Sequence, residues 1–237
     1  MLAVALPVKS VTLTLHGQPV EIALRRSDRA RKIALRVDPA KQLPELVLPW
    51  RVAESEGFEF VRSRAGWLRD RLAVQPPHVV FRDGECIPLQ GLPHRIVHDS
   101  GARRGVWREA DCIVVSGRAE HLARRLHDWL RREAHAKIEP AVQDKARALD
   151  RSVGKITVRN QRSRWGSCAP SGNLSFNWRL ILIPGWVLDY VVAHEVAHLV
   201  VPNHSAAFWR TVDRLTPNAK TGRTWLRQNS DRLFRYG

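Results

Sequence analysis

The sequence predicts an α+β protein with a β-rich amino-terminal region and a largely helical carboxy-terminal half. Apolar and polar residues alternate in short runs over the first half, as in strands that bury one face. Later in the chain, apolar residues recur with the 3.6-residue period of helices. The pattern changes near Gly117, so we expect two regions, 1–117 and 118–237. At 237 residues and 44% hydrophobic content, the chain can bury a substantial core.

The amino-terminal region reads as a series of short strands with one helix. Alternating residues over 11–15 and 20–24, on either side of His16 and Gly17, predict a β-hairpin. A helix is expected over 52–74. Further strands are expected at 32–37, 46–48, 79–81, 85–89, 95–98, 105–108 and 112–115. No internal repeat is evident in this pattern.

The second region begins with a long helical segment, 118–150, which Pro140 should kink or split. Strands are expected at 155–161 and 174–182. The next predicted helix, 185–200, is apolar nearly all round and should therefore be buried. Pro184 suits its start and Pro202 ends it. Two short helices, the first over 205–215, complete the chain.

The buried helix carries His194, Glu195 and His198 in an HExxH pattern. Residues four apart lie on one helical face, so both imidazoles can bind one metal ion. Polar groups on an apolar helix are costly without partners, and a metal would be a partner. His204 can supply a third ligand if the helix ends before it. Three ligands, an open position for water and a carboxylate base are what a zinc hydrolase requires, so we predict one Zn²⁺.

Other completions of the metal site are less favoured. No glutamate follows Glu195, which excludes a downstream Glu ligand. A metzincin would need Gly where Val201 stands and a methionine beneath the metal, but the only methionine is Met1. Asp213 remains an alternative third ligand; His204 is preferred because a histidine in a turn needs no long reach. Cys168 could also be a ligand, although a small buried side chain in a turn is the favoured interpretation.

Four segments around this motif resemble the YgjP-like predicted metal-dependent hydrolases: RWGSC (Arg164–Cys168), NWRL (Asn177–Leu180), Pro184–Glu195 and Asn203–Trp209. The resemblance includes Arg25–Pro39, and the family is related to the SprT-like and WLM zinc peptidases. It implies metal ligands at His194, His198 and His204 and a general base at Glu195. Together with the order of helix, strands, metal helix and capping helix, it indicates a minimal zincin-like core over residues 118–237.

The predicted activity is that of a zinc metallopeptidase, in which a metal-bound water activated by Glu195 attacks a peptide carbonyl. Tyr190, Arg164 and Arg179 are candidates for contacting the substrate or transition state. Residues 174–182 are the candidate strand for pairing with an extended substrate. The alternative is a metal-dependent nucleoside triphosphate pyrophosphatase, a role that has also been attached to the family. The chain has no P-loop and no carboxylate cluster for magnesium, which favours the peptidase. A nucleic-acid-binding module with a structural zinc is a third possibility, disfavoured because no fourth ligand is evident.

Charge and cysteine content limit the partners and compartment. The net charge is +16, which permits nucleic acid or nucleotides beside a peptide or protein substrate, although a solvated basic surface explains it equally well. Cys86, Cys112 and Cys168 are widely spaced and odd in number, so no disulfide framework is expected. The apolar start of the chain lacks a basic segment and is too short to span a membrane. These features predict a cytoplasmic protein without membrane contact; they leave its oligomeric state open.

Overall fold

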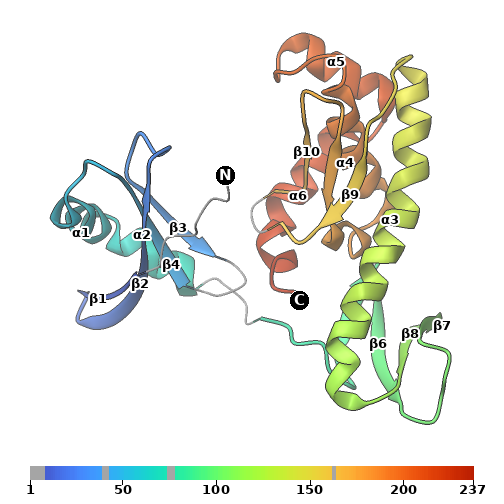
Figure 1. Ribbon diagram of the computed structural model, residues 1–237, viewed down its shortest axis with the longest axis horizontal. Helices are drawn as coiled ribbons and strands as arrows, with labels where there is room; N and C mark the ends of the chain where they lie inside the picture. The colour runs from blue at the N-terminus through green and yellow to red at the C-terminus, as the bar shows by residue number, and fades with distance from the viewer. Residues whose placement is uncertain (1–8, 39–42, 74–77, 162–163) are drawn as a thin grey trace. The chain divides into compact units, whose positions relative to one another are not determined.

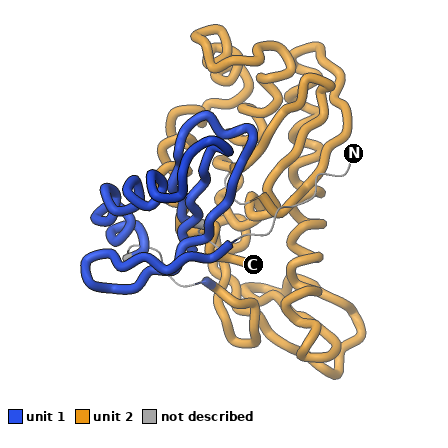
Figure 2. Tube along the Cα trace, turned by 60° about the vertical axis from the view of Figure 1, so that its left-hand side comes forward, with its two compact units in different colours: residues 1–78 blue, residues 79–237 orange. Residues whose placement is uncertain are grey.

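A computed structural model describes residues 9–38, 43–73, 78–161 and 164–237 of the chain. It confirms the α+β class and divides the chain into two compact units, Met1–His78 and Val79–Gly237 (Figure 2). The division expected near residue 117 falls inside the second unit. Strands before that residue share one hydrophobic core with the helix after it, so they are not separate from the carboxy-terminal half. The apolar start of the chain, residues 1–8, lies outside the described residues.

The first unit is a four-stranded sheet with two helices. Its strands have the order β1-β2-β4-β3. The helix expected over 52–74 is two helices, because the backbone leaves the helical conformation at Arg64, with φ −110° and ψ 13°. Val61 and Leu68, one from each helix, pack with the apolar face of the sheet into one core. The elements are β1 (Lys9–Leu15), β2 (Gln18–Ser27), β3 (Ala34–Asp38), β4 (Leu43–Pro49), α1 (Glu54–Ser63) and α2 (Ala65–Ala73).

The second unit begins with another four-stranded sheet, which packs against a long helix. Its order is β5-β6-β8-β7, with β5 (Cys86–Leu89), β6 (Leu92–Asp99), β7 (Val106–Glu109) and β8 (Cys112–Ser116). Residues 79–81, expected as a strand, form only a bridge from Val79 to Tyr236. The helix α3 (Leu122–Ala148) continues through Pro140. Pro140 and Ala136, whose carbonyl loses its helical partner, are both exposed, so water can satisfy that carbonyl.

The two sheets repeat the same topology, which corrects the expectation that the chain has no internal repeat. In each, a hairpin is followed by a parallel pairing and then an antiparallel one. Both hairpins turn through two residues with positive φ, His16-Gly17 and Gln90-Gly91. Their registers also match, since Leu15 pairs with Gln18 and Leu89 with Leu92. Four positions are identical: Leu15 and Leu89, Gly17 and Gly91, Pro19 and Pro93, Ile22 and Ile96.

The remaining elements include a small sheet and two helices, which together with α3 pack around the buried helix α4 (Gly185–Ala197). The sheet has the order β10-β11-β9, with β9 (Ile156–Arg159), β10 (Gly166–Cys168) and β11 (Leu174–Asn177). Helix α4 contacts α3, β10, α5 (Ala206–Leu215) and α6 (Ala219–Leu233). In Figure 1, α3 runs from the β6–β8 region to the level of α5. No helix among the described residues is both long and apolar enough to cross a membrane.

The strand expected over 174–182 ends at Asn177. There the Asn177 side chain accepts a hydrogen bond from the backbone N–H of Arg179 and begins a 3₁₀ helix, Trp178–Ile181. The alternation of apolar and polar residues does not match burial, because every residue from Trp178 to Ile183 is buried. Strand β11 is also paired on both sides, so it has no free edge for a substrate. The prediction that residues 174–182 form a strand that pairs with the substrate is therefore wrong.

Candidate metal centre

Contacts on several sides hold helix α4 in place upstream of His194 and His198, which lie at its carboxy-terminal end. Pro184 precedes the helix in extended conformation, which suits a helix start. Asp189, in the middle of the helix, accepts from Lys145 of α3 at 2.6 Å and from the Thr216 hydroxyl at 2.5 Å. Gly222 of α6 approaches Tyr190 so closely that a Cβ there would lie 2.6 Å from the Tyr190 Cβ. The helix can therefore hold side chains in fixed positions.

His194, His198 and His204 come together as the sequence predicts. One possible ligand atom from each lies within 4.8 Å of the other two. His194 and His198 lie one turn apart at the end of α4, and His204 follows in the loop before α5. The Nε2 atoms of His194 and His204 are 3.0 Å apart. Among the described residues, this is the group of histidine, cysteine and carboxylate side chains that could hold a metal ion.

The chemistry of the three imidazoles fits a metal ion. His198 Nδ1 lies 3.1 Å from the Val201 carbonyl oxygen, so this nitrogen carries the proton and Nε2 keeps its lone pair for a ligand. Burial, and then the neighbouring histidines and Arg223, lower the pKa of His194 to about 4. Burial also lowers the pKa of His198. Neutral imidazoles that point toward one another are the form in which histidine binds zinc.

One aromatic ring supports all three histidines. The centroid of the buried Phe208 ring is 4.9 Å from that of His194, 4.5 Å from His198 and 4.8 Å from His204. Phe208 lies in the first turn of α5, after the loop that carries His204. It fixes the ring planes by packing rather than by hydrogen bonds. Sequence reasoning assigned Phe208 no role, although it belongs to the Asn203–Trp209 segment.

Glu195 adjoins His194, His198 and His204, hereafter called the metal group, and faces strand β10. It is only 7% exposed. A Cβ added to Gly166 of β10 would lie 2.6 Å from the Glu195 Cδ and Oε1 atoms, so glycine leaves room for this carboxylate. Burial raises the pKa of Glu195 to about 7, against the opposing effect of the Arg164 charge. Burial also raises the pKa of the Cys168 thiol, and the charge of the nearby Glu195 adds a smaller effect in the same direction.

Strand β10 is tied to the rest of the unit by the residues before it. Asn177 donates from its side chain to the carbonyls of Gln161 and Arg164, and its backbone N–H donates to the Trp165 carbonyl. The Trp165 indole donates to Ser230 of α6 at 3.0 Å. These bonds link the RWGSC and NWRL segments: RWGSC contains β10, and Asn177 of NWRL holds the residues that precede it.

A cavity of about 480 Å³ opens between β10 and α4. Gly166, Ser167 and Cys168 line one side and the three histidines and Glu195 line the other. Cys168 thus lies in the cavity wall but outside the metal group. Among the described residues, β10 pairs with β11 at one edge and with no strand at its other edge. The cavity therefore combines the metal group, a carboxylate and an unpaired strand edge.

The candidate substrate contacts occupy three different environments. Tyr190 is buried on α4, with its ring centroid 6.0 Å from that of His194. Arg164 is near enough to Glu195 to affect its pKa. The guanidinium of Arg179 instead donates to the Tyr236 and Gly237 carbonyls and to Asn160, between the rings of Trp178 and Phe234.

Asp213, the alternative third ligand, lies outside the metal group. It is an exposed residue of α5 in the wall of a neighbouring cavity. His204 takes the position that Asp213 would have needed, because Pro202 and the short loop after α4 turn the chain back toward His194.

Comparison with known proteins gives a family match that covers most of the chain. A family model described as "YgjP-like, metallopeptidase domain" matches residues 31–229. The chain is also similar to a solved structure, the metallopeptidase zymogen of Pyrococcus abyssi abylysin, with 20% identity. That match covers 38% of this chain and 93% of the other, with a TM-score of 0.35, which does not establish a shared fold. No curated protein matches the chain.

Proposed function

The chain belongs to the YgjP-like metallopeptidase family, and we propose that it cleaves peptide bonds with one zinc ion held by His194, His198 and His204. The observation that carries this proposal is the shared cavity of three imidazoles and a buried carboxyl group. When bound, the zinc ion would supply Lewis acidity toward a water and a substrate carbonyl. A zinc ion held by these three ligands would keep one position for water, because no fourth protein ligand joins them among the described residues.

Glu195 is proposed to move the proton. Its carboxylate would take a proton from the attacking water and pass it to the leaving amine. Gly166 supports this role because its missing side chain lets the carboxylate lie against β10. Arg164 and Tyr190 remain candidates for stabilising the oxyanion, since both lie near the reacting groups. Arg179 is not retained for this role because its guanidinium holds the carboxy-terminal residues.

Strand β10 is proposed to position the substrate. An extended peptide added to the unpaired edge of β10 would run along the cavity, past Glu195 and the histidines. Main-chain hydrogen bonds would then hold the scissile carbonyl in place, independently of the substrate's side chains. This assigns to β10 the role that the sequence suggested for residues 174–182.

The test is metal analysis joined to an activity screen. The zinc-loaded protein is assayed on casein, with and without single-stranded DNA, and separately on nucleoside triphosphates. We expect about one zinc per chain and cleavage of casein. The Glu195→Gln variant should keep its zinc and lose cleavage by roughly a hundredfold or more, the size of a general-base contribution. Cleavage of triphosphates alone, or full casein cleavage by Glu195→Gln, would contradict the proposal.

A further inference from the structure

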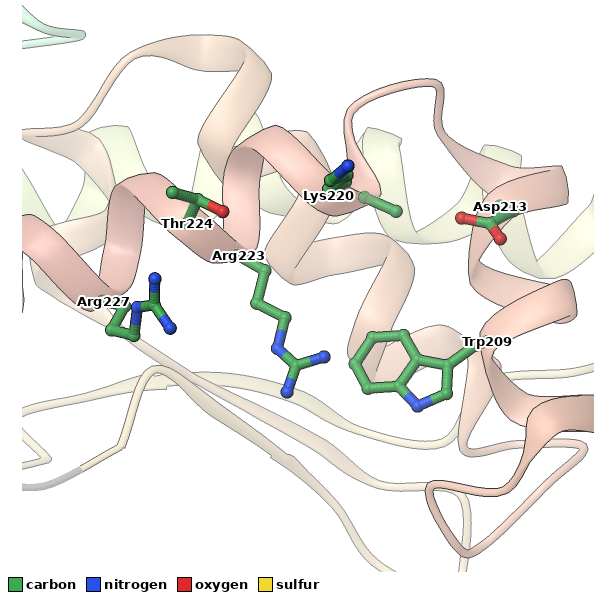
Figure 3. A pocket seen from close by; sticks show the side chains of 7 residues that line it. Trp209, Asp213, Lys220, Arg223, Thr224 and Arg227 are labelled. Atoms are coloured by element: carbon green, nitrogen blue, oxygen red, sulfur yellow. The ribbon is translucent and has the colours of Figure 1, made fainter.

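A second cavity, of about 570 Å³, lies beside the metal centre between α5 and α6. Figure 3 shows its walls: Trp209 and Asp213 come from α5, while Lys220, Arg223, Thr224 and Arg227 come from α6. The three basic residues follow one another at spacings of three and four, so they lie on one face of α6. We call these three residues the α6 cations.

The cavity adjoins the metal centre through one ring. The Trp209 ring centroid is 5.9 Å from that of His194 and 6.0 Å from that of His204. The Arg223 guanidinium carbon lies 4.7 Å from the centroid of the same indole. Arg223 extends from α6 toward Trp209 in Figure 3. A substrate bound at the metal centre can therefore place a neighbouring group in this cavity.

Among the residues that the structure describes, the α6 cations have no anionic partner. No ion pair or side-chain hydrogen bond of Lys220, Arg223 or Arg227 occurs among the described residues. Arg223 instead makes a cation–π contact with the Trp209 ring. Asp213 supplies the one carboxylate of the cavity lining, so the lining carries a surplus of positive charge. Like charges held together repel, and an anionic ligand would relieve that repulsion.

We propose that this cavity is a substrate subsite for a carboxylate group of the peptide, and that the enzyme prefers acidic residues or a free carboxy terminus near the cleaved bond. This inference rests on the proposed peptidase function. Arginine binds carboxylates through paired N–H donors, and Thr224 adds a hydroxyl beside them. A compact anionic group fits better than a long polyanion, because Asp213 would repel a backbone that continued across the cavity.

The test uses matched peptides that separate the two sources of carboxylate. A peptide spanning a casein cleavage site is made with Glu or Gln near the cleaved bond, each with a free or amidated carboxy terminus. We expect about tenfold higher kcat/KM for one carboxylate-bearing member over its neutral counterpart. Preference for Glu assigns the subsite to a side chain; preference for the free terminus assigns it to the chain end.

Two double variants decide whether the α6 cations are responsible. Lys220→Glu with Arg227→Glu should abolish the preference and favour a Lys-containing peptide instead. The control, Arg214→Glu with Arg232→Glu, makes the same change in net charge at exposed positions outside the cavity lining. The control should keep the preference of the original protein, which excludes a general effect of charge.

Binding gives a second measurement that does not depend on turnover. Fluorescence anisotropy of labelled peptides on the Glu195→Gln variant should show the same preference and the same dependence on the α6 cations. If this holds while the original protein cuts no peptide, the subsite stands and the peptidase proposal fails. Cleavage or binding without preference overturns the subsite alone. Loss of single-stranded DNA binding in the Lys220/Arg227 variant, with Glu and Gln peptides equivalent, would also overturn it.

Discussion

The sheets β1–β4 and β5–β8 share one topology but have different surroundings. The first packs with α1 and α2 into a core of its own. The second packs against α3, and that core continues through α4 to the end of the helix that carries His194 and His198. The same strand order thus serves a self-contained unit in one case and part of the unit with the three histidines in the other. What covers the sheet, rather than the sheet itself, decides which unit it belongs to.

The hairpin tips show this difference most directly. In β5–β6, the backbone N–H groups of Gln90 and Gly91 donate to the carbonyls of Ile181 and Leu182, just before α4. In β1–β2, a Cβ added to Gly17 would meet no atom within 4 Å. The second hairpin therefore supports the segment that leads into the metal helix, whereas the first tip is open.

Truncating the matching core isoleucines tests whether the two sheets unfold separately. Ile96→Ala and Ile22→Ala remove the same side chain from equivalent buried positions. Each should lower the free energy of unfolding of its own unit by about 2–5 kcal/mol. Zinc release and tryptophan fluorescence are followed together in urea. Ile96→Ala should release zinc at lower urea, whereas Ile22→Ala should leave zinc release unchanged. Equal shifts in both variants would mean that the two units unfold as one.

The sequence was most informative where side chains act locally. The spacing of His194, His198 and His204 predicted one metal group, and the structure brings these three residues together. The hairpin at Gly17 also followed from residues close in the chain. In each case, a helical period or a turn requirement fixes the geometry over a few residues.

Long-range packing explains what the sequence could not supply. The break after residue 78 depends on whether β5–β8 packs against α3, and alternation does not reveal the partner of a buried face. The strand expected over 174–182 failed because Asn177 caps a 3₁₀ helix whose residues are all buried. Phe208 and Arg223 come from helices that meet α4 only in the folded chain. The hairpin repeat is an exception, because its signal was present in the sequence: the pattern Leu-x-Gly-x-Pro occurs at both Leu15–Pro19 and Leu89–Pro93.

Matched glycine substitutions compare the two hairpin tips. Gly17→Ala and Gly91→Ala both place a side chain at positive φ, 77° and 83°, which costs about 1–2 kcal/mol. At Gly91 the new Cβ would also lie 2.9 Å from Pro184, adding about 1–3 kcal/mol of overpacking. Urea unfolding should show the larger loss for Gly91→Ala, together with weaker zinc retention in a chelator titration. Equal losses and equal zinc retention would show that the docked tip does not support α4.

The smallest expected effect comes from exchanging one residue between the repeats. His94 in β6 is equivalent to Val20 in β2, since each pairs with the matching residue of its hairpin, Ile87 and Leu13. His94 is 2% exposed, and its Nδ1 lies 2.9 Å from the Leu92 carbonyl oxygen. Its buried Nε2 has no hydrogen-bond partner among the described residues. His94→Val removes that unpaired nitrogen at the expense of one hydrogen bond. Because an unsatisfied buried group costs more than a typical hydrogen bond contributes, we expect a gain of about 1 kcal/mol in the free energy of unfolding. Urea unfolding at neutral pH measures it, with Val20→His as the reciprocal change in the first sheet. A loss of stability in His94→Val would mean that the histidine contributes packing which valine, at the equivalent place, cannot replace.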